Sequence, residues 1–394
     1  MSEPLKVLIL SSRWPDSVRP LVGKTMERQA IELAARGVEI EVVAPIGLPP
    51  FPFSRLARHA RFDAVPAEEV RSGLKVSRPR FRTIPRVHVS QPLSMARTLL
   101  PHLRRIRERF AFDVIAAQFF WPEGPAAVRL ADALGIPLSI KGRGPDVEAW
   151  AQRRGPGRMI ADAGRRADGM LAISADLRRH MIGLGMPADR IEVHYTGIDR
   201  ALFHPLGRAA QKAKLGVAGP LLLSAGNLIA RKRHDLAIEA LARLPGATLI
   251  VVGSGPLLGA LQGRARALGV EGRVRFAGAV PHDTMAAYYS AADVTVHAAS
   301  LEGFANVRVE SLACGTPVVS TAAGGADELI RSPDAGRIVE ADAGAIAAAA
   351  AGLIAGPPLA EAAARTVDAF SWPRNAEQLE AHLRKLAERG RRSG

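Results

Sequence analysis

Short apolar segments alternate with helix-like segments along this chain, and the alternation limits the folds available to it. The first apolar segment, residues 6–12, is followed by a helical pattern over residues 25–37, in which Met26, Ala30 and Leu33 share one face. Further strand-like segments in the first half are residues 38–45, 113–118, 137–142, 169–174 and 191–197. Strands that alternate with helices form mainly parallel sheets, whose binding sites lie at the carboxyl ends of the strands. The pattern therefore predicts an α/β fold.

The alternation stops and restarts near the middle of the chain. Residues 206–220 are polar and rich in Gly and Ala, which is typical of a connector. The strand-like segments that follow are residues 220–227, 247–253, 274–278, 294–299 and 316–321. A chain of 394 residues is also too long for one ordinary core. We therefore predict two doubly wound halves of about two hundred residues each, with a linker at residues 200–218.

The composition is that of a globular protein. Hydrophobic residues make up 48% of the chain and charged residues 23%, so it can bury sizeable cores. The single cysteine, Cys314, excludes an intramolecular disulfide and a cysteine-based zinc site, which fits a reducing compartment. The N-terminus has no cleavage-site pattern, and the longest uncharged run, residues 343–360, contains two prolines. We expect a cytoplasmic protein without a transmembrane segment.

Two carboxylates, Glu302 and Glu310, lie eight residues apart in an otherwise small and apolar stretch. On one helix they would be about 80° apart around the axis and about 12 Å apart along it, so they cannot act as a paired acid and base on one atom. Gly303 indicates a loop, and residues 306–313 have a helical pattern. We predict that the first turn of this helix binds an anion and that Glu310 accepts hydrogen bonds from ligand hydroxyls. The alternative is that both are ordinary surface acids.

A cluster of cations follows the first predicted strand of the second half. Arg231, Lys232 and Arg233 lie between that strand and a helix. At the carboxyl end of a strand they would meet a diphosphate, the lysine as a point charge and the arginines as planar forks. The alternative is a solvated loop of cations. The glycine turn at residues 251–256 allows close backbone approach, but a turn that starts a helix explains it equally well.

In the first half, two polar segments that follow strands, residues 119–124 and 141–150, would face one cleft. Gly23 lies in the loop after the first strand, where the absence of a side chain makes room for a ligand. Three histidines lie in separate segments without metal-ligand spacing and are interpreted as structural or surface residues: His194, His282 and His297. We therefore predict no metal site.

The net charge of +15 is concentrated in residues 51–110, which hold fourteen Lys and Arg against four Asp and Glu. Within this region, residues 94–110 place Met95, Leu99 and Leu103 at helical spacing, with arginines between them. The apolar face should pack on a sheet, and the arginine face could lie on an anionic membrane, which would suit a lipid-linked acceptor. A solvated helix is the alternative. A nucleic-acid binder is disfavoured, because the chain has no zinc finger, recognition helix or aromatic stacking platform.

Residues 226–330 carry, in order, the cation cluster, the glycine turn, the strand VRFAG and the Glu302–Glu310 pair followed by SLACGTPVV. Together they resemble the retaining glycosyltransferases of family 4, which have the GT-B fold. The first half resembles the same family more loosely, at residues 13–45, 113–147 and 195–205. The resemblance implies two Rossmann-like domains that face a central cleft, residues 1–200 and 201–372. It also implies that a C-terminal helix, residues 373–394, crosses back to the first domain.

The resemblance implies roles for individual residues. Glu310 would accept hydrogen bonds from the nucleotide ribose, Lys232 would bind the diphosphate, and Glu302 would lie beside the donor sugar. The implied catalytic group is Glu302, Lys232 and Arg231. The other implied donor-binding residues are Gly303, Phe304, Ala305, Asn306, Asn227, Gly23, Arg275 and Phe276. The implied acceptor-side residues are Gln118, Arg143 and Asp146.

Three positions depart from the family pattern. Asn227 stands where an arginine is usual in the phosphate motif, and Gln118 and Arg143 stand where histidines are common. Gln118 cannot exchange a proton near neutral pH, but a retaining transfer depends mainly on charge stabilisation at the departing diphosphate. These departures bear on the identity of the donor sugar and on the activity.

The implied function is retaining transfer of a sugar from a nucleotide-sugar to a hydroxyl acceptor, in polysaccharide or glycolipid assembly, without a metal or other cofactor. The expected partners are the nucleotide-sugar donor and a glycan or lipid-linked acceptor, with no nucleic acid; contact with the inner face of a membrane through residues 51–110 is left open. Two alternatives also stay open. One is a nucleotide-sugar-binding protein without transferase activity, and the other is a nucleotide-sugar epimerase of the same fold, against which Gln118 argues.

Overall fold

The chain forms two compact units. The computed structural model describes residues 3–393, except for the side chains of residues 58, 392 and 393. Unit 1 comprises Met1–Thr196 and Trp372–Gly394, and unit 2 comprises Gly197–Ser371. These divisions lie slightly before the expected boundaries at residues 200 and 372. Each unit contains a mainly parallel sheet with helices around it, which confirms the predicted α/β class with two domains.

Unit 1 is built on an eight-stranded sheet with the order β10-β9-β8-β7-β1-β2-β5-β4. Its strands are β1 (Lys6–Leu10), β2 (Glu39–Val43), β4 (Glu68–Arg71), β5 (Leu74–Ser77), β7 (Val114–Ala117), β8 (Leu138–Gly142), β9 (Gly169–Ala172) and β10 (Ile191–Val193). Neighbouring strands are parallel except β4 and β5, which form an antiparallel pair at one edge. Because β1 lies between β2 and β7, the strand order reverses there. The β1–β7 junction is therefore the topological switch point of unit 1, where doubly wound sheets bind ligands.

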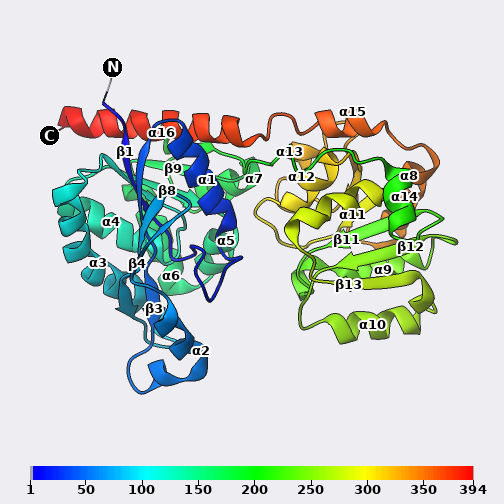
Figure 1. Cartoon of the computed structure of the whole chain (residues 1–394), viewed down its shortest axis with the longest axis horizontal. Helices are drawn as coiled ribbons and strands as arrows, with labels where there is room; N and C mark the ends of the chain where they lie inside the picture. Colours follow the sequence, from blue (N-terminus) through cyan, green and yellow to red (C-terminus); the bar gives the residue numbers. More distant parts are fainter. Residues whose placement is uncertain (1–2, 394) are drawn as a thin grey trace. The chain divides into compact units, whose positions relative to one another are not determined.

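Helices cover both faces of this sheet. On one face, α1 (Lys24–Ala35) and α16 (Trp372–Ser393) lie side by side (Figure 1) and bury Leu33 and Leu383 against Val7 and Ile9 of β1. Leu8 and Leu10, which alternate with these β1 residues, are buried on the other face. That face is covered by α3 (Ser90–Arg109), α4 (Glu123–Leu134) and α6 (Arg154–Arg166). The shorter helices α5 (Pro145–Ala151) and α7 (Ala175–Gly183) lie near the ends of the sheet. The C-terminal helix thus supplies part of the core of unit 1.

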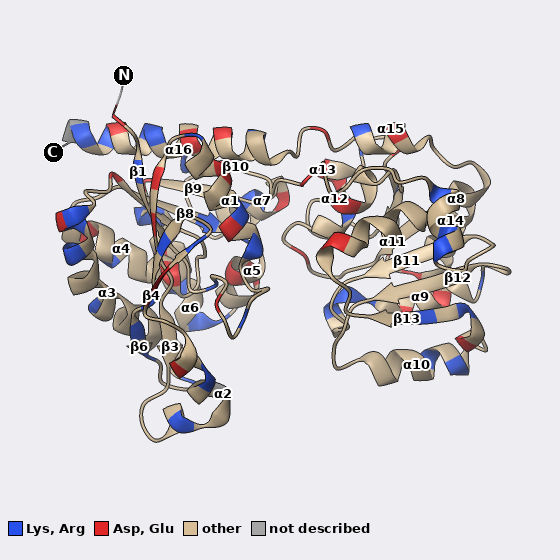
Figure 2. Cartoon of the chain, viewed as in Figure 1, with Lys and Arg blue, Asp and Glu red and all other residues tan. Residues whose placement is uncertain are grey.

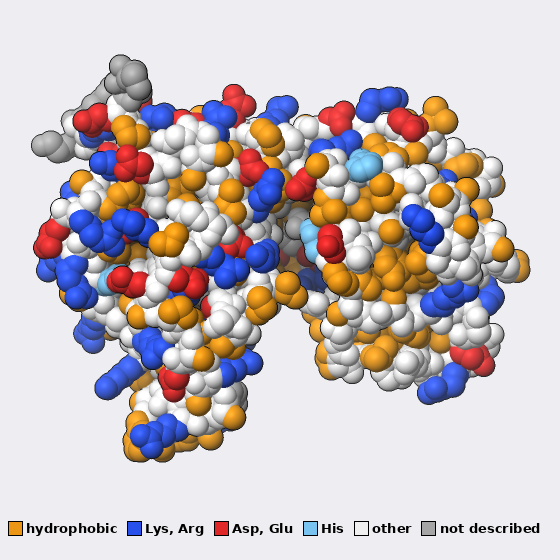
Figure 3. Space-filling model, in the orientation of Figure 1, with side chains coloured by type: hydrophobic (Ala, Val, Ile, Leu, Met, Phe, Trp, Pro, Cys, Tyr) orange, Lys and Arg blue, Asp and Glu red, His pale blue; other side chains and the backbone are white. Residues whose placement is uncertain are grey.

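A small lobe of unit 1 escapes the alternating pattern of the sequence. It contains a two-stranded parallel sheet, β3 (Ile46–Leu48) with β6 (Arg80–Arg82), and the short helix α2 (Ala57–Ala60) between the one-turn helices η1 (Phe53–Arg55) and η2 (Arg61–Ala64). The lobe lies at the lower end of unit 1 in Figure 1, and hydrophobic and basic side chains are mixed on it in Figure 3. Beside it, α3 buries Met95, Leu99 and Leu103, as its spacing predicts, and carries exposed arginines, whose positions on the ribbon are blue in Figure 2.

Unit 2 is built on a six-stranded, all-parallel sheet with the order β13-β12-β11-β14-β15-β16. Its strands are β11 (Leu221–Ala225), β12 (Thr248–Val252), β13 (Val274–Gly278), β14 (Val294–His297), β15 (Val318–Ser320) and β16 (Gly336–Ile338). Counted from β11, this is the 3-2-1-4-5-6 order of a Rossmann fold. The switch point lies between β11 and β14, so loops that leave these two strands should form the site.

The helices of unit 2 also lie on both faces of the sheet. The buried side chains of α9 (His234–Leu241), α10 (Leu258–Ala267) and α14 (Ala343–Ala355) form one core with the strands. The helices α8 (Arg208–Lys214), α11 (Met285–Ala291), α12 (Asn306–Ala313) and α15 (Ala360–Arg365) pack on one another, and α13 (Ala326–Leu329) follows β15. Over the described part of the chain, no helix is both long enough and apolar enough to cross a bilayer.

Candidate functional site

In unit 2, the loop that leaves β11 and the loop that leaves β14 are joined at the switch point. The backbone N–H of Ser300 donates to the carbonyl oxygen of Arg231 at 2.8 Å. A third loop, which follows β15, lies against Glu302. Its Gly324 (φ 59°) is so close that a Cβ there would lie only 2.4 Å from the carbonyl oxygen of Glu302. The three loops therefore hold the side chains that they carry in fixed positions.

The three predicted catalytic residues meet here. Lys232 Nζ lies 2.6 Å from Glu302 Oε2, and Arg231 Nη1 lies 3.2 Å from the same oxygen. Arg231 also donates to the carbonyl oxygen of Leu301 at 3.0 Å. The side chains of Lys232 and Glu302 are only 11% and 14% exposed, so the pair is shielded from solvent. One carboxylate holds two cations at the carboxyl ends of β11 and β14, and the group carries a net positive charge.

This arrangement suits a ligand that brings negative charge. A diphosphate that reaches the group would replace Glu302 as the partner of Lys232 and Arg231, whose side chains are already oriented. Charges act more strongly in such a shielded place than in water. The sequence predicts the cations as ligands of a diphosphate, and the structure adds that Glu302 positions them.

Glu310 lies on α12, about one turn after the helix begins at Asn306, and Glu302 precedes the helix as predicted. Its Oε2 accepts a hydrogen bond from the Tyr289 hydroxyl at 2.8 Å, and its Oε1 lies 3.1 Å from His282 Nε2. Burial, together with Glu310, raises the pKa of Tyr289 well above its usual value. The hydrogen bond to Glu310 raises the pKa of His282. Neither partner of Glu310 is a predicted site residue.

The other predicted donor residues divide into two groups. Gly303, Phe304 and Ala305 lead into α12, which begins at Asn306, and the Phe304 ring stacks on Phe370 with centroids 5.8 Å apart. Asn227 is exposed, directly after β11. In the sequence these residues flank Lys232 and Glu302, on the loops that follow β11 and β14.

Arg275 and Phe276 do not join them. Arg275 donates to the carbonyl oxygens of Leu215 and Gly216, at 2.7 and 2.9 Å, on the side where β11 begins. Phe276 packs on the core of unit 2. The end of β13 that reaches the site side is Gly278, so the interpretation of Arg275 and Phe276 as donor contacts is corrected to structural roles.

In unit 1, the three predicted acceptor-side residues also lie together. Arg143 donates through Nη2 to Gln118 Oε1 at 2.6 Å and through Nε to the Gln118 carbonyl oxygen at 3.1 Å. Asp146 accepts from the backbone N–H groups of Arg143 and Phe120, at 2.8 and 2.7 Å. Burial raises the pKa of Asp146 and lowers that of Arg143 to about 10. The group lies at the carboxyl ends of β7 and β8.

Gly23 plays a different part from the predicted one. Its φ is 85°, and a Cβ there would lie 2.1 Å from the carbonyl oxygen of Arg13. The space beside Gly23 is therefore filled by the backbone of its own loop, and the glycine lets the loop after β1 close on itself. We correct its role from ligand space to loop closure.

Glu123 is a site residue that the sequence reasoning missed. It is fully buried, and its Oε1 accepts from the backbone N–H of Ser12 at 2.8 Å and from the Ser12 hydroxyl at 2.6 Å. Burial raises its pKa to about 7. The bond ties the loop after β1 to the start of α4, across the switch point of unit 1. The sequence signal for it is the polar segment FFWPEG after a predicted strand. Nothing in that segment marks its carboxylate as buried.

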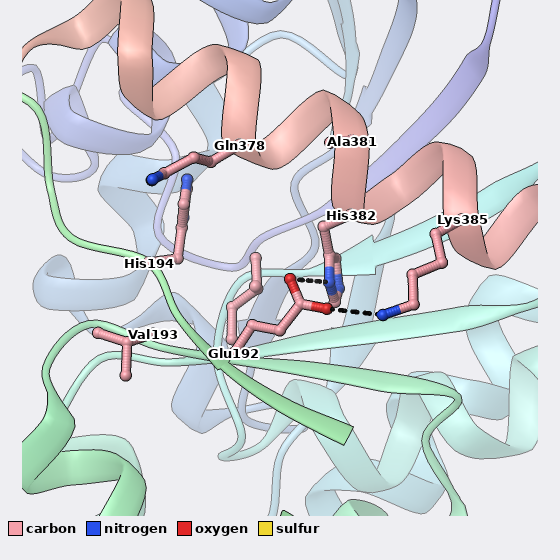
Figure 4. A pocket seen from close by; sticks show the side chains of 8 residues that line it. Glu192, Val193, His194, Gln378, Ala381, His382 and Lys385 are labelled. Carbon is pink, nitrogen blue, oxygen red and sulfur yellow. Dashed lines mark hydrogen bonds and ion pairs between the residues drawn. The ribbon is translucent and has the colours of Figure 1, made fainter. Parts of the chain in front are cut away.

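A second polar cluster lies beneath α16, around a cavity of about 300 Å³ (Figure 4). Glu192 of β10 lies 3.3 Å from both His382 and Lys385 of α16, and its hydrogen bond to His382 lowers its pKa to about 2. Deeper in, Lys141 Nζ lies 2.6 Å from His194 Nδ1, and burial lowers the pKa of both groups well below their usual values. The contacts of Glu192, and the 2.8 Å hydrogen bond between His194 Nε2 and the Asn375 carbonyl oxygen, hold α16 on unit 1. Within residues 3–393, no three His, Cys, Asp or Glu side chains are grouped to hold a metal.

Two family models match the chain. The model described as Glycosyltransferase Family 4 matches residues 22–202. The model described as Glycosyl transferases group 1 matches residues 208–368. The first match lies within unit 1, apart from its last few residues, and the second lies within unit 2.

Individual proteins match the chain over nearly its whole length. The D-inositol 3-phosphate glycosyltransferase of Mycobacterium tuberculosis is 29% identical over 434 residues, which cover 100% of this chain and 86% of the relative. The structure of sucrose-phosphate synthase from Thermosynechococcus elongatus superposes with a TM-score of 0.79 at 21% identity, over 97% of this chain and 99% of that chain. The Anabaena protein HepE, in complex with UDP, gives a TM-score of 0.74 at 22% identity, over 97% and 100% of the two chains. At these identities the two structures establish the fold.

Proposed function

Because this chain belongs to family 4 of the glycosyltransferases and transfers a sugar from a nucleotide-sugar, we propose that the transfer retains the anomeric configuration and that unit 2 binds the donor. The observation that carries the assignment of unit 2 is the Lys232–Glu302–Arg231 group at the switch point of a 3-2-1-4-5-6 sheet. The donor diphosphate would bind there, and Glu310 would accept hydrogen bonds from the ribose.

In the proposed reaction, the bond between the anomeric carbon and the diphosphate oxygen breaks, and its electron pair stays on that oxygen. Lys232 and Arg231 stabilise the growing negative charge. The acceptor hydroxyl attacks the same face of the sugar, and its proton passes to the departing oxygen, since Gln118 cannot accept it. A single well-placed donor is worth roughly 3 to 4 kcal/mol in comparable sites. We therefore propose that Lys232 and Arg231 stabilise this charge without a metal ion.

The donor ribose would compete with the present partners of Glu310 for its two carboxylate oxygens. The Tyr289 hydroxyl and the His282 ring occupy its two oxygens, so ribose hydroxyls would displace one or both of them. Two structures of HepE are described as complexes with UDP and with UDP-glucose. UDP is therefore the first nucleotide to try for this chain.

The test is a binding screen of the full chain against UDP, GDP, ADP and their common sugar conjugates, read by thermal unfolding. A ligand at 100 times its dissociation constant adds about 2.7 kcal/mol of stability. We expect one nucleotide to raise the melting temperature of the parent and of Arg264→Ala, an exposed cation of unit 2, but much less that of Lys232→Ala. If no nucleotide stabilises the parent, the assignment of the donor site fails.

We also propose that the acceptor belongs to polysaccharide or glycolipid assembly and that unit 1 touches an anionic membrane through residues 51–110. The arginines of α3 at positions 97, 104 and 105 are exposed, and Phe51, Phe53 and Leu56 of the nearby lobe are exposed hydrophobics. Each cation near such a surface contributes about 1 kcal/mol.

Sedimentation with phosphatidylglycerol vesicles tests the membrane contact. Replacing Arg97, Arg104 and Arg105 by Gln should reduce the bound fraction strongly, whereas replacing Arg154 and Arg158 of α6 should not. Equal binding of the two variants would contradict a contact through α3.

A further inference from the structure

Unit 1 contains an open pocket of about 380 Å³ whose lining does not include Gln118, Arg143 or Asp146. Ser12 and Arg13 follow β1, Pro45 follows β2, and Pro122 follows β7, so the pocket lies at the carboxyl ends of three adjacent strands. Its volume falls within the range of about 300–1,000 Å³ that is usual for small-molecule sites. By place and by size it can hold a sugar-sized ligand.

The polar wall of this pocket is cationic. It contains Arg13, Arg19, His59 and Arg61, and no carboxylate of the described residues lines it. Arg19 is compensated from behind, because its guanidinium donates to the buried Asp16 at 3.0 and 2.8 Å. The wall therefore presents a surplus of positive charge.

The surplus comes from Arg13 and Arg61. Their guanidinium groups lie 5.6 Å from the Phe119 ring and 5.3 Å from the Phe62 ring. Among the described residues, neither has an ion-pair partner. Two arginines that line one pocket, with no described carboxylate beside them in its wall, are suited to an anion, and their planar forks match the oxygens of a phosphate.

The remainder of the pocket is apolar and firmly held. Phe62 and Phe81 are buried and form part of its wall. The loop that carries Arg13 is fixed at one side by the bond from Ser12 to Glu123 and at the other by the close approach of Gly23. Aromatic faces next to cations suit a ligand that joins a sugar or polyol to a charged group.

From this geometry we propose that the acceptor of the transfer carries a phosphate group, which Arg13 and Arg61 bind in this pocket. The inference rests on the proposed function, because it takes unit 1 as the acceptor side. The phosphate belongs either to a soluble sugar or polyol phosphate or to the head group of a lipid, and both present the same oxygens to the arginines.

The experiment measures binding to the full chain by titration calorimetry, with glucose 6-phosphate as the soluble probe and glucose as its uncharged match. The lipid arm uses phosphatidylcholine vesicles with and without phosphatidic acid. The test variant is Arg13→Gln/Arg61→Gln. The control is Arg154→Gln/Arg158→Gln, which removes the same charge from exposed positions of α6. UDP binding is measured for every variant.

We expect at least one phosphate probe to bind the parent and the control alike, with binding to the test variant at least tenfold weaker and UDP binding unchanged. Dependence on Arg13 and Arg61 with glucose 6-phosphate identifies a soluble acceptor, and the same dependence only with phosphatidic acid identifies a lipid. Equal binding of glucose and glucose 6-phosphate, together with no effect of the variant on vesicles, overturns the proposal. Loss of UDP binding in the parent instead refutes the donor assignment.

Discussion

The two units place their sites at the same point of similar sheets but treat their cations differently. In unit 2, Lys232 and Arg231 are held by Glu302, and their side chains are 11% and 34% exposed. In unit 1, Arg13 and Arg61 face a pocket without carboxylates, and Arg143 is bonded to the neutral Gln118. Cations that a carboxylate already orients are suited to stabilise charge that develops in a reaction. Cations that stand open are suited to capture a ligand that arrives charged.

The largest effect is expected when the amine of Lys232 in unit 2 is removed. For Lys232→Ala we expect kcat to fall by about 10²- to 10³-fold, because one donor to the departing oxygen is lost. Steady-state kinetics with the donor identified by the binding screen measures this effect. Arg264→Ala, which removes an exposed cation from α10, should keep kcat within about twofold. An unchanged kcat in Lys232→Ala would exclude the lysine from the transition state.

The buried carboxyl group of Glu123 allows a sharp test on the unit 1 side. Its pKa is about 7 in the folded protein against 4.5 ordinarily, so the folded state binds the proton more tightly than the unfolded state. Stability from this group is present below pH 4.5 and is lost as the pH rises to 7, by about 3 kcal/mol in total. Glu123→Gln should remove this decline. Urea unfolding at several pH values measures it.

Glu32→Gln on α1 is the matched control for Glu123. Glu32 forms a surface pair with Arg28, so its replacement should leave the pH dependence of stability as it is in the parent. If Glu123→Gln loses stability with rising pH as steeply as the parent does, the carboxyl group of Glu123 is not the source of the decline.

Glu310 sharpens the comparison, because among the described side chains its partners are Tyr289 and His282 and no Lys or Arg. For Glu310→Gln we expect the Kd for UDP to rise about thirtyfold, which corresponds to about 2 kcal/mol for hydrogen bonds to a charged group. Calorimetric titration measures the Kd, with Glu239→Gln on the surface of α9 as control. A Kd equal to that of the parent would mean that the ribose binds elsewhere.

The smallest effect is expected at His282. Its raised pKa means that the pair with Glu310 is complete below pH 6.5 and is lost as the pH rises through the raised pKa. The ring is exposed, so the pair contributes at most about 1 kcal/mol. His282→Ala should therefore bind UDP slightly more tightly than the parent at pH 6 and equally at pH 8. Weaker binding at pH 6 would show instead that the imidazole contacts the nucleotide.

The unit 2 site could be predicted because its parts directly follow strands. Lys232 comes seven residues after β11, and Glu302 comes five residues after β14. Parallel strands bring such loops to one edge of a sheet whatever the details of packing. The position of Arg275 along its strand could not be read in the same way. Arg275 pairs with Ile250 near the start of β13, and a register shift follows between Phe276 and Gly278, which no residue pattern announced.

The unit 1 pocket could not be predicted. Its residues come from the loop after β1 and from the lobe around α2, whose short helices and three-residue strands give no period. The bond between Ser12 and Glu123 joins residues 111 positions apart, and in the sequence Glu123 is only an acid at the start of a helix. The pairing that raises its pKa exists only after the sheet has formed.

The assignment of α16 to unit 1 has a consequence for how the protein is made. The ribosome synthesises all of Gly197–Ser371 before α16, so the sequence of unit 2 is complete before that of unit 1. Until α16 is made, the first part of unit 1 exposes the surface that Leu379, Leu383 and Leu386 later cover. Since domains fold as units during synthesis, the order of completion is the reverse of the order of translation. A chain that stops before Trp372 would thus damage the half that was made first.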